Sequence, residues 1–420
     1  MNRALIFMAV LLAVSWQGVS SFAAEDVSIT DSSGGVVLEH VDKDSIPALV
    51  RLLDDQDYQV WKQAEGALVS FGGDSVPELL KAVEKDPPPV RAITVLGYIK
   101  DGRAVAPLSR LINSSAHGVA DTSRSALSAI GGPAVGTLAG LLEKDGYRNA
   151  AAATLKGITP SADALDVVRP LLKSDGWATR ASAADVLGIW KDSGSVDGIK
   201  ALLGDERAGV REKAVVAYRL AAEEYDIDLL LRLAEDESGL VRREAMAMMT
   251  RNPSTRVVEP MLRIMATGGG EDRAAAIAAA GYTRDPRLVE PLVKALDDAD
   301  DRVVGGAVYF LGYQGAVQSR PDILALFKKR REFSDPMVVQ NACEALVVFG
   351  EPLDADDLHM FLTYLGKGSN YDTRYAVLDL VEKYGGSGDA ETVKAVEAYT
   401  ARETDQVLNM RARAILAKLR

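Results

Sequence analysis

The stretch DPRLVEPLVKALDDADDRVVGGAVYFLGYQG, residues 285–315, decides how the chain folds. Its apolar residues recur at the three- and four-residue spacing of an amphipathic helix, first in Leu288, Leu292, Ala295 and Leu296, then in Val303, Ala307, Phe310 and Leu311. The acidic run 297–301 separates the two stripes, and Asp300 is suited to cap the second helix. We expect Gly312 and Gly315 to end that helix, because glycine readily adopts the left-handed conformation. The stretch therefore predicts a helical hairpin of about 31 residues, too small to bury both stripes alone.

The hairpin pattern recurs along the chain. One apolar position in each first helix repeats at intervals of 28 to 35 residues: Leu49, Leu79, Leu108, Leu138, Leu171, Ile199, Leu230, Met261, Leu292, Ile323, Leu358 and Val393. Alanine keeps one position in the second helices: Ala64, Ala151, Ala183, Ala214, Ala245, Ala276, Ala307, Ala342, Ala376 and Ala414. Because a small side chain lets two helices approach closely, we expect neighbouring second helices to pack tightly. The chain is therefore predicted to be all-α, a solenoid of about twelve such hairpins.

Proline occupies a fixed place in several first helices. The sequence Val-x-Pro-Leu occurs at residues 105–108, 168–171 and 289–292, and residues 258–261 nearly match it. Proline has no backbone N–H to donate, so these residues are expected to kink the helix or delay its start.

The N-terminal residues have a different character. Arg3 precedes an apolar run at residues 4–14, and Ser21 and Ala23 occupy the −3 and −1 positions of a cut before Ala24. We therefore predict a secretory signal peptide over residues 1–23, with an uncleaved anchor as the alternative, and a periplasmic or extracellular location in a bacterial cell envelope. The run is shorter than the roughly 20 residues of a membrane span, so no integral membrane segment is expected after cleavage. Residues 24–44 are predicted to be a polar tail or cap, and residues 45–420 the repeat array.

Composition and charge narrow the class of partner. Of the 420 residues, 48% are hydrophobic and 26% charged, which is typical of a globular protein. Removing residues 1–23 takes away one arginine and no acid, so the formal charge changes from −12 to −13. This excess of acid disfavours nucleic acid and anionic membranes, which need clustered cations. The single cysteine, Cys343, has no partner in the chain and falls on an apolar position, so we expect a buried thiol.

The repeats resemble the short HEAT-like repeats of the phycobilisome-lyase type, over roughly residues 45–420. That pattern places Asp in the turn and Val-Arg and Ala in the second helix, as in Asp205, Val210, Arg211 and Ala214 and again in Asp236, Val241, Arg242 and Ala245. Residues 298–312 match as well, although Val304 replaces the arginine. The departures from the pattern cluster in residues 114–131 and in the longer repeats after Gly312. The resemblance implies a right-handed α-solenoid whose first helices line the concave side. It also implies binding more than catalysis.

Two rows of basic residues follow from the repeat. Arg148, Arg180, Arg211, Arg242 and Arg273 recur every 31 or 32 residues. They form either a cationic stripe or structural bonds to the turn acids Asp175, Asp205 and Asp236. A second basic row lies on the first helices, two positions after the repeating apolar residue described above: Arg51, Lys81, Arg110, Lys173, Arg232, Arg263 and Lys294. This row is either a ridge on the concave surface for an acidic partner or a solvated face paired within helices, through Glu259 with Arg263 and Glu290 with Lys294.

The densest positive cluster is a third candidate for partner binding. It consists of Lys328, Lys329, Arg330 and Arg331, at the end of a predicted helix that starts near Pro321. Cations at a helix C-terminus are stabilised by the macrodipole, which accounts for one or two of the four. The others leave an anionic ligand or partner open.

Signals for catalysis are weak. The histidines His40, His117 and His359 are far apart, and none is followed by Glu, so the His-Glu metal motif of HEAT-like hydroxylases is missing. No nucleophile elbow, phosphate loop or Cys-x-x-Cys occurs, and residues 297–301 lack the ligand spacing of a calcium loop. We assign no catalytic, cofactor-binding or metal-binding residue, and no cofactor.

The sequence supports three hypotheses. The first is an exported, non-enzymatic scaffold that binds a protein or peptide along its concave surface. The second is an accessory, lyase-like protein that holds a cofactor or acceptor protein in a deep aromatic pocket, with Trp177, Trp190 and Tyr147 as its candidates. The third is a purely architectural spacer. Neither the partner nor the oligomeric state follows from the sequence.

Overall fold

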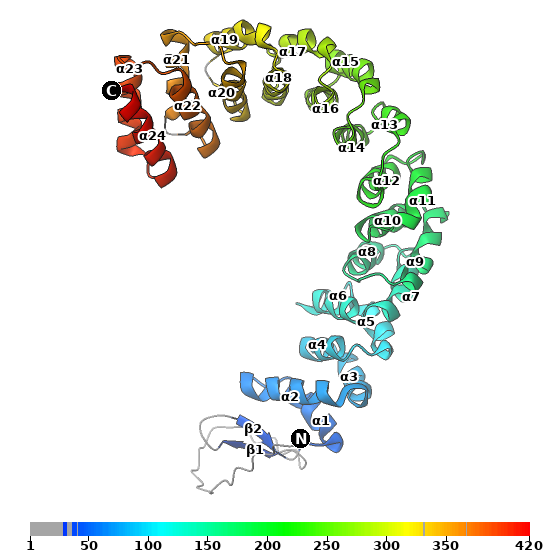
Figure 1. Ribbon diagram of the computed structural model, residues 1–420. Coiled ribbons are helices and arrows are strands. Elements are labelled where there is room, and N and C mark those ends of the chain that lie inside the picture. The colour runs from blue at the N-terminus through cyan, green and yellow to red at the C-terminus, as the bar shows by residue number, and fades with distance from the viewer. Residues whose placement is uncertain (1–27, 32–35, 40, 331, 367) are drawn as a thin grey trace, which may run out of the picture. The chain divides into compact units, whose positions relative to one another are not determined.

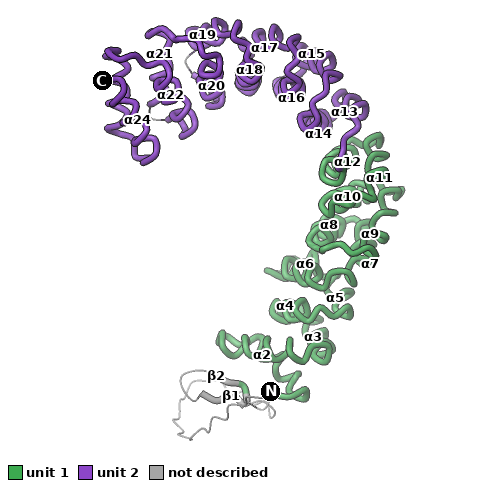
Figure 2. The backbone as a smooth tube through the Cα atoms, viewed as in Figure 1, with its two compact units in different colours: residues 1–222 green, residues 223–420 purple. Residues whose placement is uncertain are grey.

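The computed structural model describes residues 28–31, 36–39, 41–330, 332–366 and 368–420. The chain divides into two compact units, residues 1–222 and residues 223–420 (Figure 2). The predicted leader, residues 1–23, lies outside the described residues. Part of the predicted tail or cap is described as a pair of antiparallel strands, β1 (Ser28–Asp31) and β2 (Val36–Glu39), in which Ser28 is opposite Glu39. The backbone N–H of Leu38 donates to Oε1 of Gln63 at 2.9 Å, which ties β2 to the second helix of the chain.

Unit 1 contains six helix pairs in its described residues. The first helices are α1 (Ile46–Leu52), α3 (Val76–Val83), α5 (Val105–Leu111), α7 (Gly132–Leu141), α9 (Ala162–Val168) and α11 (Val196–Leu202). The second helices are α2 (Tyr58–Phe71), α4 (Val90–Ile99), α6 (Val119–Ile130), α8 (Arg148–Lys156), α10 (Trp177–Ile189) and α12 (Ala208–Ala221). The first helices form one layer and the second helices form the other (Figure 1).

Unit 2 likewise contains six described pairs. Its first helices are α13 (Ile227–Leu233), α15 (Val258–Thr267), α17 (Val289–Ala295), α19 (Arg320–Lys329), α21 (Ala355–Leu362) and α23 (Ala390–Arg402). Its second helices are α14 (Gly239–Met249), α16 (Gly270–Gly281), α18 (Asp301–Gln314), α20 (Met337–Phe349), α22 (Tyr371–Tyr384) and α24 (Gln406–Leu419). The predicted all-α solenoid of about twelve hairpins is therefore confirmed.

Short 3-10 turns lead into many of the first helices. They are η1 (Lys43–Ser45), η2 (Gly72–Asp74), η3 (Gly102–Ala104), η5 (Ser193–Ser195), η6 (Thr255–Val257), η7 (Pro286–Leu288) and η8 (Val317–Ser319). Two more, η4 (Arg169–Lys173) and η9 (Thr363–Leu365), follow α9 and α21.

The hairpin at residues 285–315 forms largely as expected. Asp300 caps α18 by accepting from the N–H of Arg302 at 3.0 Å, and Gly315 ends the helix with a φ of 68°. Gly312, however, does not end it, because this residue lies inside α18. The two predicted stripes are buried, except that Ala295 is only half-buried.

The prolines do not act as predicted. Pro107, Pro260 and Pro291 each lie at the third position of a helix, and the helix starts two residues before the proline. The first four N–H groups of a helix have no intrahelical acceptor, so proline loses no hydrogen bond there. Only at Pro170 does the expected disturbance occur, since η4 replaces the α-helix in that segment.

The apolar position that repeats in the first helices, from Leu49 to Val393, is buried in ten of its twelve occurrences. At the other two positions, Leu171 and Val393 are half-buried, and the nearby Leu172 and Val396 supply the buried side chains instead. The alanine row is buried as far as Ala376, but Ala414 is exposed and Ala412 is the buried residue of α24. The register of the repeat therefore shifts where its length changes.

Neighbouring second helices approach each other closely at glycine–alanine contacts. A Cβ added at Gly312 of α18 would lie 2.8 Å from the Ala345 Cβ of α20, and one at Gly188 of α10 would lie 2.6 Å from the Ala217 Cα of α12. Such close contacts let the second-helix layer be the shorter of the two. In unit 2 the second helices accordingly line the inner side of the curve and the first helices its outer side (Figure 1). The expectation that first helices line the concave side is therefore wrong for this unit.

Candidate partner-binding surfaces

The arginine row of the second helices is engaged in structural bonds. Arg273 donates from Nε and Nη2 to Asp298 of the next repeat, at 2.8 and 2.7 Å, and from Nη1 to the Gly268 carbonyl at 2.7 Å. Arg242 bonds Asp272 in the same way, with its Nη2 at 2.6 Å. The structural interpretation of this row is confirmed at these positions, although Asp272 and Asp298 were not among the predicted acids.

The rest of the row follows the same design with local differences. Arg180 donates to the Asp205 carboxylate at 2.8 Å and to the Ser174 carbonyl at 2.9 Å. Arg148 bonds Asp145 and the Leu142 carbonyl of its own repeat. Arg211 donates to the Asp205 carbonyl at 2.9 Å. Each guanidinium thus satisfies carbonyl groups left unpaired where a first helix ends.

This network changes the pKa of its acids. Burial raises the pKa of Asp298, but the hydrogen bonds from Arg273 and from the N–H of Asp300 outweigh that effect, so the pKa lies below its usual value. In unit 1 the side-chain hydrogen bond from Arg169 lowers the pKa of Asp192 although burial opposes it. Both carboxylates are therefore held ionised in the folded chain.

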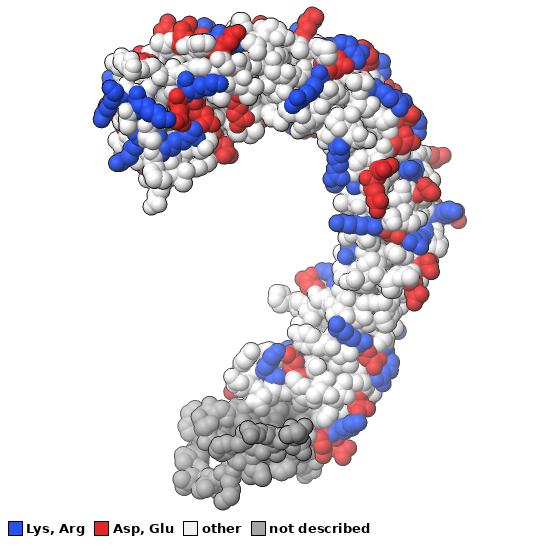
Figure 3. All heavy atoms as spheres, in the orientation of Figure 1, with Lys and Arg blue, Asp and Glu red and all other residues white. Residues whose placement is uncertain are grey.

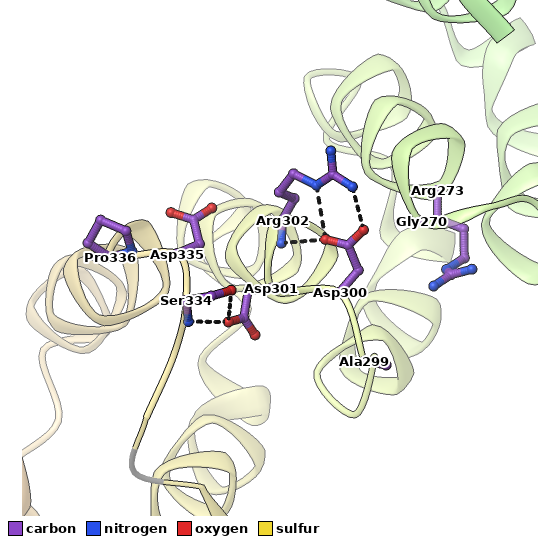
Figure 4. Close-up of a pocket in the computed structure, with 9 residues that line it drawn as sticks. All are labelled: Gly270, Arg273, Ala299, Asp300, Asp301, Arg302, Ser334, Asp335 and Pro336. Carbon is purple, nitrogen blue, oxygen red and sulfur yellow. Dashed lines mark hydrogen bonds and ion pairs between the residues drawn. The ribbon is translucent and has the colours of Figure 1, made fainter.

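A hollow of about 670 Å³ lies beside the starts of α16, α18 and α20 (Figure 4). On its α18 side Arg302 donates to Asp300, with its Nη2 at 2.7 Å, and Ser334 donates from its hydroxyl to Asp301 at 2.7 Å (Figure 4). Asp335 accepts from the N–H of Met337 at 2.9 Å and so caps α20. The charged groups of this hollow form ion pairs and hydrogen bonds with neighbouring side chains and with backbone N–H groups at helix starts. The hollow is therefore part of the structural contacts between repeats.

The basic row of the first helices is exposed but does not line the inner side of unit 2. Its described members lie on α1, α3, α5, η4, α13, α15 and α17: Arg51, Lys81, Arg110, Lys173, Arg232, Arg263 and Lys294. In unit 2 these helices form the outer layer (Figure 1). The predicted placement on the concave side is therefore wrong for the three members in that unit, because their helices form the outer layer (Figure 1). That these residues bind a partner stays a prediction.

Some members of the row are paired and others are not. Lys294 contacts Glu290 at 2.7 Å, as predicted, and Lys81 contacts Glu78 at 2.8 Å. Arg263 does not pair with Glu259. Its contact is with Glu235 of the preceding repeat at 3.7 Å, and Glu259 accepts from Arg287. Within the described residues no ion pair is formed by the other members, Arg51, Arg110, Lys173 and Arg232.

The cluster at the end of α19 is mostly paired with carboxylates. Lys328 contacts the buried Asp357 at 2.7 Å and Lys329 contacts Asp297 at 2.7 Å. Arg330 forms an ion pair with Asp301. Arg331 lies outside the described residues. Ion pairs with neighbouring repeats thus account for three of the four cations, which reduces the case for an anionic ligand at this cluster.

The exposed apolar side chains are found almost entirely on second helices, which sequence reasoning missed. Among the described residues thirteen large hydrophobic side chains are exposed, and only Val167 of α9 lies on a first helix. The others are Tyr58, Tyr98, Trp177, Ile189, Leu240, Tyr313, Met337, Val348, Tyr371, Tyr375, Val407 and Met410. In the face that Figure 3 shows, the side of unit 2 formed by α16 and α18 is mainly uncharged. The signal in the sequence was the aromatic and apolar residues of the second helices that fall outside their core stripes.

Two aromatic groups stand out on the second helices of unit 2. Tyr309 and Tyr313 of α18 stack at 6.0 Å, with Tyr282 edge-on to Tyr313 and the Arg284 guanidinium 4.2 Å from the Tyr313 ring. Burial raises the pKa of Tyr309. On α22, Tyr371 stacks on Tyr375 at 6.1 Å, and Arg411 of α24 lies 4.2 Å from the Tyr375 ring. A guanidinium over a tyrosine ring is attracted by the ring and helps to hold it in place.

The three aromatic residues of the lyase-like hypothesis do not form one pocket. Trp177 begins α10 and Trp190 follows its last residue, so about 20 Å of helix separates them. Trp190 donates from its indole N–H to the Leu155 carbonyl at 3.1 Å, which closes the end of α8. Tyr147 lines a different hollow, between α5 and α7.

The remaining candidates are structural. Cys343 is fully buried, as expected, and burial raises the pKa of its thiol. His359 of α21 contacts Asp389 at 2.9 Å and Glu391 at 3.3 Å, which joins α21 to α23. Within the described ranges no three His, Cys, Asp or Glu side chains are placed to hold a metal ion. Nor is any described helix long and apolar enough to cross a membrane.

Stacked helix pairs, with first helices in one layer and second helices in the other, define an α-solenoid repeat protein. Residues 145–219 and 227–311 match the family of HEAT repeats. The chain is a HEAT-like repeat protein. Its finer resemblance to the phycobilisome-lyase type stays a prediction.

Several solved structures are similar to the chain. Importin beta matches with a TM-score of 0.51 at 14% identity, over 90% of this chain and 60% of importin beta. YibA from Escherichia coli is 19% identical with a TM-score of 0.47, over 58% of this chain and 91% of YibA. Kap95p, in a structure on its binding to RanGDP, is 13% identical with a TM-score of 0.43, over 91% of this chain and 57% of Kap95p. At such identities the likeness to importin beta shows the fold alone. No protein with a curated description matches the chain.

Proposed function

We propose that the protein is a non-enzymatic scaffold that binds a protein or peptide partner along the second helices, with unit 2 as the main surface. The observation that carries this proposal is the location of the large exposed apolar side chains, because twelve of the thirteen in the described part of the chain lie on second helices. Eight of the twelve lie in unit 2, among them Tyr313, Val348 and Met410. Exposed apolar and aromatic side chains concentrated on one layer of helices are typical of protein interaction sites.

The available area fits a stable complex. Each second helix of unit 2 is about 20 Å long at 1.5 Å per residue, and packed helices lie about 10 Å apart. Six such helices side by side present roughly 1,200 Å². A standard protein interface buries about 800 Å² on each partner, so the second-helix face of unit 2 is large enough.

The test uses two variants in the same unit. Tyr313→Glu with Val348→Glu places charges on the second-helix face, at side chains that are 37% and 63% exposed, so folding should be retained. Arg232→Glu, Arg263→Glu and Lys294→Glu reverse charge on the outer, first-helix face. Pull-down from envelope extracts, with recovered proteins quantified by mass spectrometry, should show at least a tenfold loss of specific partners with the first variant. Recovery lost only with the outer-face variant would refute the proposal.

The lyase-like alternative gains no support from the geometry, because Trp177 and Trp190 mark opposite ends of α10. We therefore propose no catalytic or cofactor-binding role.

Export is the second part of the proposal and rests on the sequence of residues 1–23 alone. Arg3, the apolar run at 4–14 and the small residues Ser21 and Ala23 support cleavage before Ala24 and a periplasmic or extracellular location. The mature N-terminus, measured by mass spectrometry after expression with the native leader, should be Ala24. A chain that keeps its leader and stays in the cytoplasm would refute export.

A further inference from the structure

The outward face of α7 differs from that of the other first helices. Its sequence, GPAVGTLAGL, carries no charged residue, whereas every other described first helix carries at least one. Gly132, Gly136 and Gly140 follow one another at four-residue spacing, so they share one face, and all three are exposed.

The fold does not require these glycines. A Cβ added at Gly132, Gly136 or Gly140 would meet nothing within 4 Å, and none of the three has a positive φ. Glycine within a helix destabilises it relative to alanine, because the unfolded chain has more freedom to lose. These glycines lower the stability of the helix, and no packing contact within the chain explains them. A helix face without side chains is suited to close approach by the backbone of a partner.

A hollow of about 410 Å³ lies over this face, between α5 and α7. Gly136 and Gly140 line one wall, Ser109 and Arg110 of α5 line the other, and Lys144 and Tyr147 close one end. Arg110 and Lys144 are exposed and form no ion pair within the described residues. The acids beside Lys144 do not neutralise the hollow. Asp145 is bound to Arg148 at 2.8 Å, and Glu143 lines a different hollow.

The cations are held on ordered backbone. The amide of Asn113, just after α5, donates to the Gly146 carbonyl, which fixes the segment after Lys144 against the end of α5. The Leu142 carbonyl accepts from Arg148 at 2.7 Å and from Thr179 at 3.2 Å. Arg110 therefore lies near the C-terminal end of α5 and Lys144 just after the C-terminal end of α7. Both are at one end of a groove that Gly136 and Gly140 line without side chains.

The geometry points to a second docking site on the first-helix face of unit 1, which takes a partner helix that carries acidic residues at one end. The glycine face of α7 lets another helix approach nearer than the usual 8–10 Å between axes. Acidic side chains on that helix would meet Arg110 and Lys144, and Tyr147 offers a hydroxyl beside them. This site is separate from the apolar second-helix face and does not depend on it.

The test is a selection for helical peptides. A displayed library of 18-residue helical peptides is selected on the full chain and depleted on the Gly136→Leu, Gly140→Leu variant, whose side chains fill the groove. Selected peptides should carry Asp or Glu at one end and small residues along one face. Their affinity, measured by fluorescence anisotropy, should fall at least tenfold for the leucine variant and for Arg110→Glu with Lys144→Glu, and should weaken in 0.5 M salt.

Two controls keep the outcome interpretable. Lys294→Glu makes the same charge change at an equivalent first-helix position in unit 2 and should leave the affinity unchanged. Gly136→Ala with Gly140→Ala should raise the thermal midpoint, which shows that the positions tolerate side chains. Failure to select peptides that distinguish wild type from the leucine variant would overturn the inference. Selected peptides without an acidic excess, or affinities insensitive to the charge reversal, would overturn it equally.

Discussion

Individual arginines join one repeat to the next. Arg273 is about one-quarter exposed and Asp298 only 13% exposed, so their two hydrogen bonds are largely shielded from water. By contrast, Lys294 and Glu290 form an ion pair in which both side chains are more than 70% exposed. The two pairs lie in adjacent repeats and provide a matched comparison of buried and exposed charge.

The first prediction concerns these pairs. Arg273→Met should lower the free energy of unfolding by about 1–3 kcal/mol, because it removes the donor of the Gly268 carbonyl and leaves the Asp298 carboxylate with the N–H of Asp300 alone. Lys294→Met should change it by less than about 0.5 kcal/mol, as expected for an exposed pair. Urea unfolding followed by circular dichroism measures both. Equal effects of the two substitutions would contradict the assignment of Arg273 to the framework.

A second prediction at this scale uses pH. Burial raises the pKa of Asp389, but hydrogen bonds from Thr392 and His359 outweigh it and lower the pKa to about 2. A carboxyl with a lowered pKa contributes its full stability above the pKa of the unfolded chain, about 3.9, and loses it as pH falls towards the folded value. Asp389→Asn should therefore cost about 1–2 kcal/mol at pH 6 and almost nothing at pH 2. A difference that stays constant between pH 6 and pH 2 in urea titrations would count against this.

Sequence reasoning did best for residues whose role is local. The Asp300 cap and the buried Cys343 follow from spacing along one or two helices, and both are found in the structure. The partner of Arg263 was predicted wrongly, because a contact within the helix was assumed where Glu235 of the preceding repeat is the partner. Contacts between repeats depend on how far each pair is rotated, and periodicity alone does not give that rotation.

Among the helices, glycine occurs both where two helices are in close contact and where a helix surface is open to solvent. Gly312 of α18 packs against Ala345 of α20, whereas Gly136 of α7 faces open space. The same residue type in the same kind of element therefore serves opposite purposes.

The third prediction exchanges both glycines for alanine. Gly312→Ala should destabilise the protein by about 1–3 kcal/mol, because its Cβ would overlap the Ala345 Cβ and push α18 from α20. Gly136→Ala should stabilise it by about 0.5–1 kcal/mol through helix propensity. Thermal unfolding of the two single variants gives the sign directly, and a stabilised Gly312→Ala would show that the second helices are not in close contact there.

The prediction of helices from the sequence was reliable, while the choice of the inner layer was not. The two stripes of residues 285–315 yield α17 and α18 at nearly the expected bounds, since helix periodicity is a property of a short segment. The concave side was assigned to first helices by resemblance, and unit 2 shows the reverse (Figure 1). The alanine row indicated tight second-helix packing, and tight packing of one layer is what places that layer inside.

Across the whole molecule, the first-helix layer and the second-helix layer present different surfaces. The first-helix face carries exposed cations with partner acids, among them Lys81, Arg263 and Lys294. Exposed cations also occur on second helices, such as Lys213 of α12 and Arg302 of α18. The second-helix face carries the exposed aromatic and apolar side chains. A repeat protein needs internal contacts only between neighbouring repeats, so such a face is free to serve a partner.

The most direct measurement is hydroxyl-radical footprinting of the full chain with and without the partner recovered by pull-down. Oxidation rates of Tyr313, Tyr375 and Met410, which are exposed on α18, α22 and α24, report on the second-helix face. Met265, half-buried on the first helix α15, reports on the opposite face. The account predicts that the partner slows oxidation of the three second-helix residues at least threefold and leaves Met265 unchanged. Protection of Met265, with Tyr313, Tyr375 and Met410 oxidised as fast as in the free chain, would contradict it.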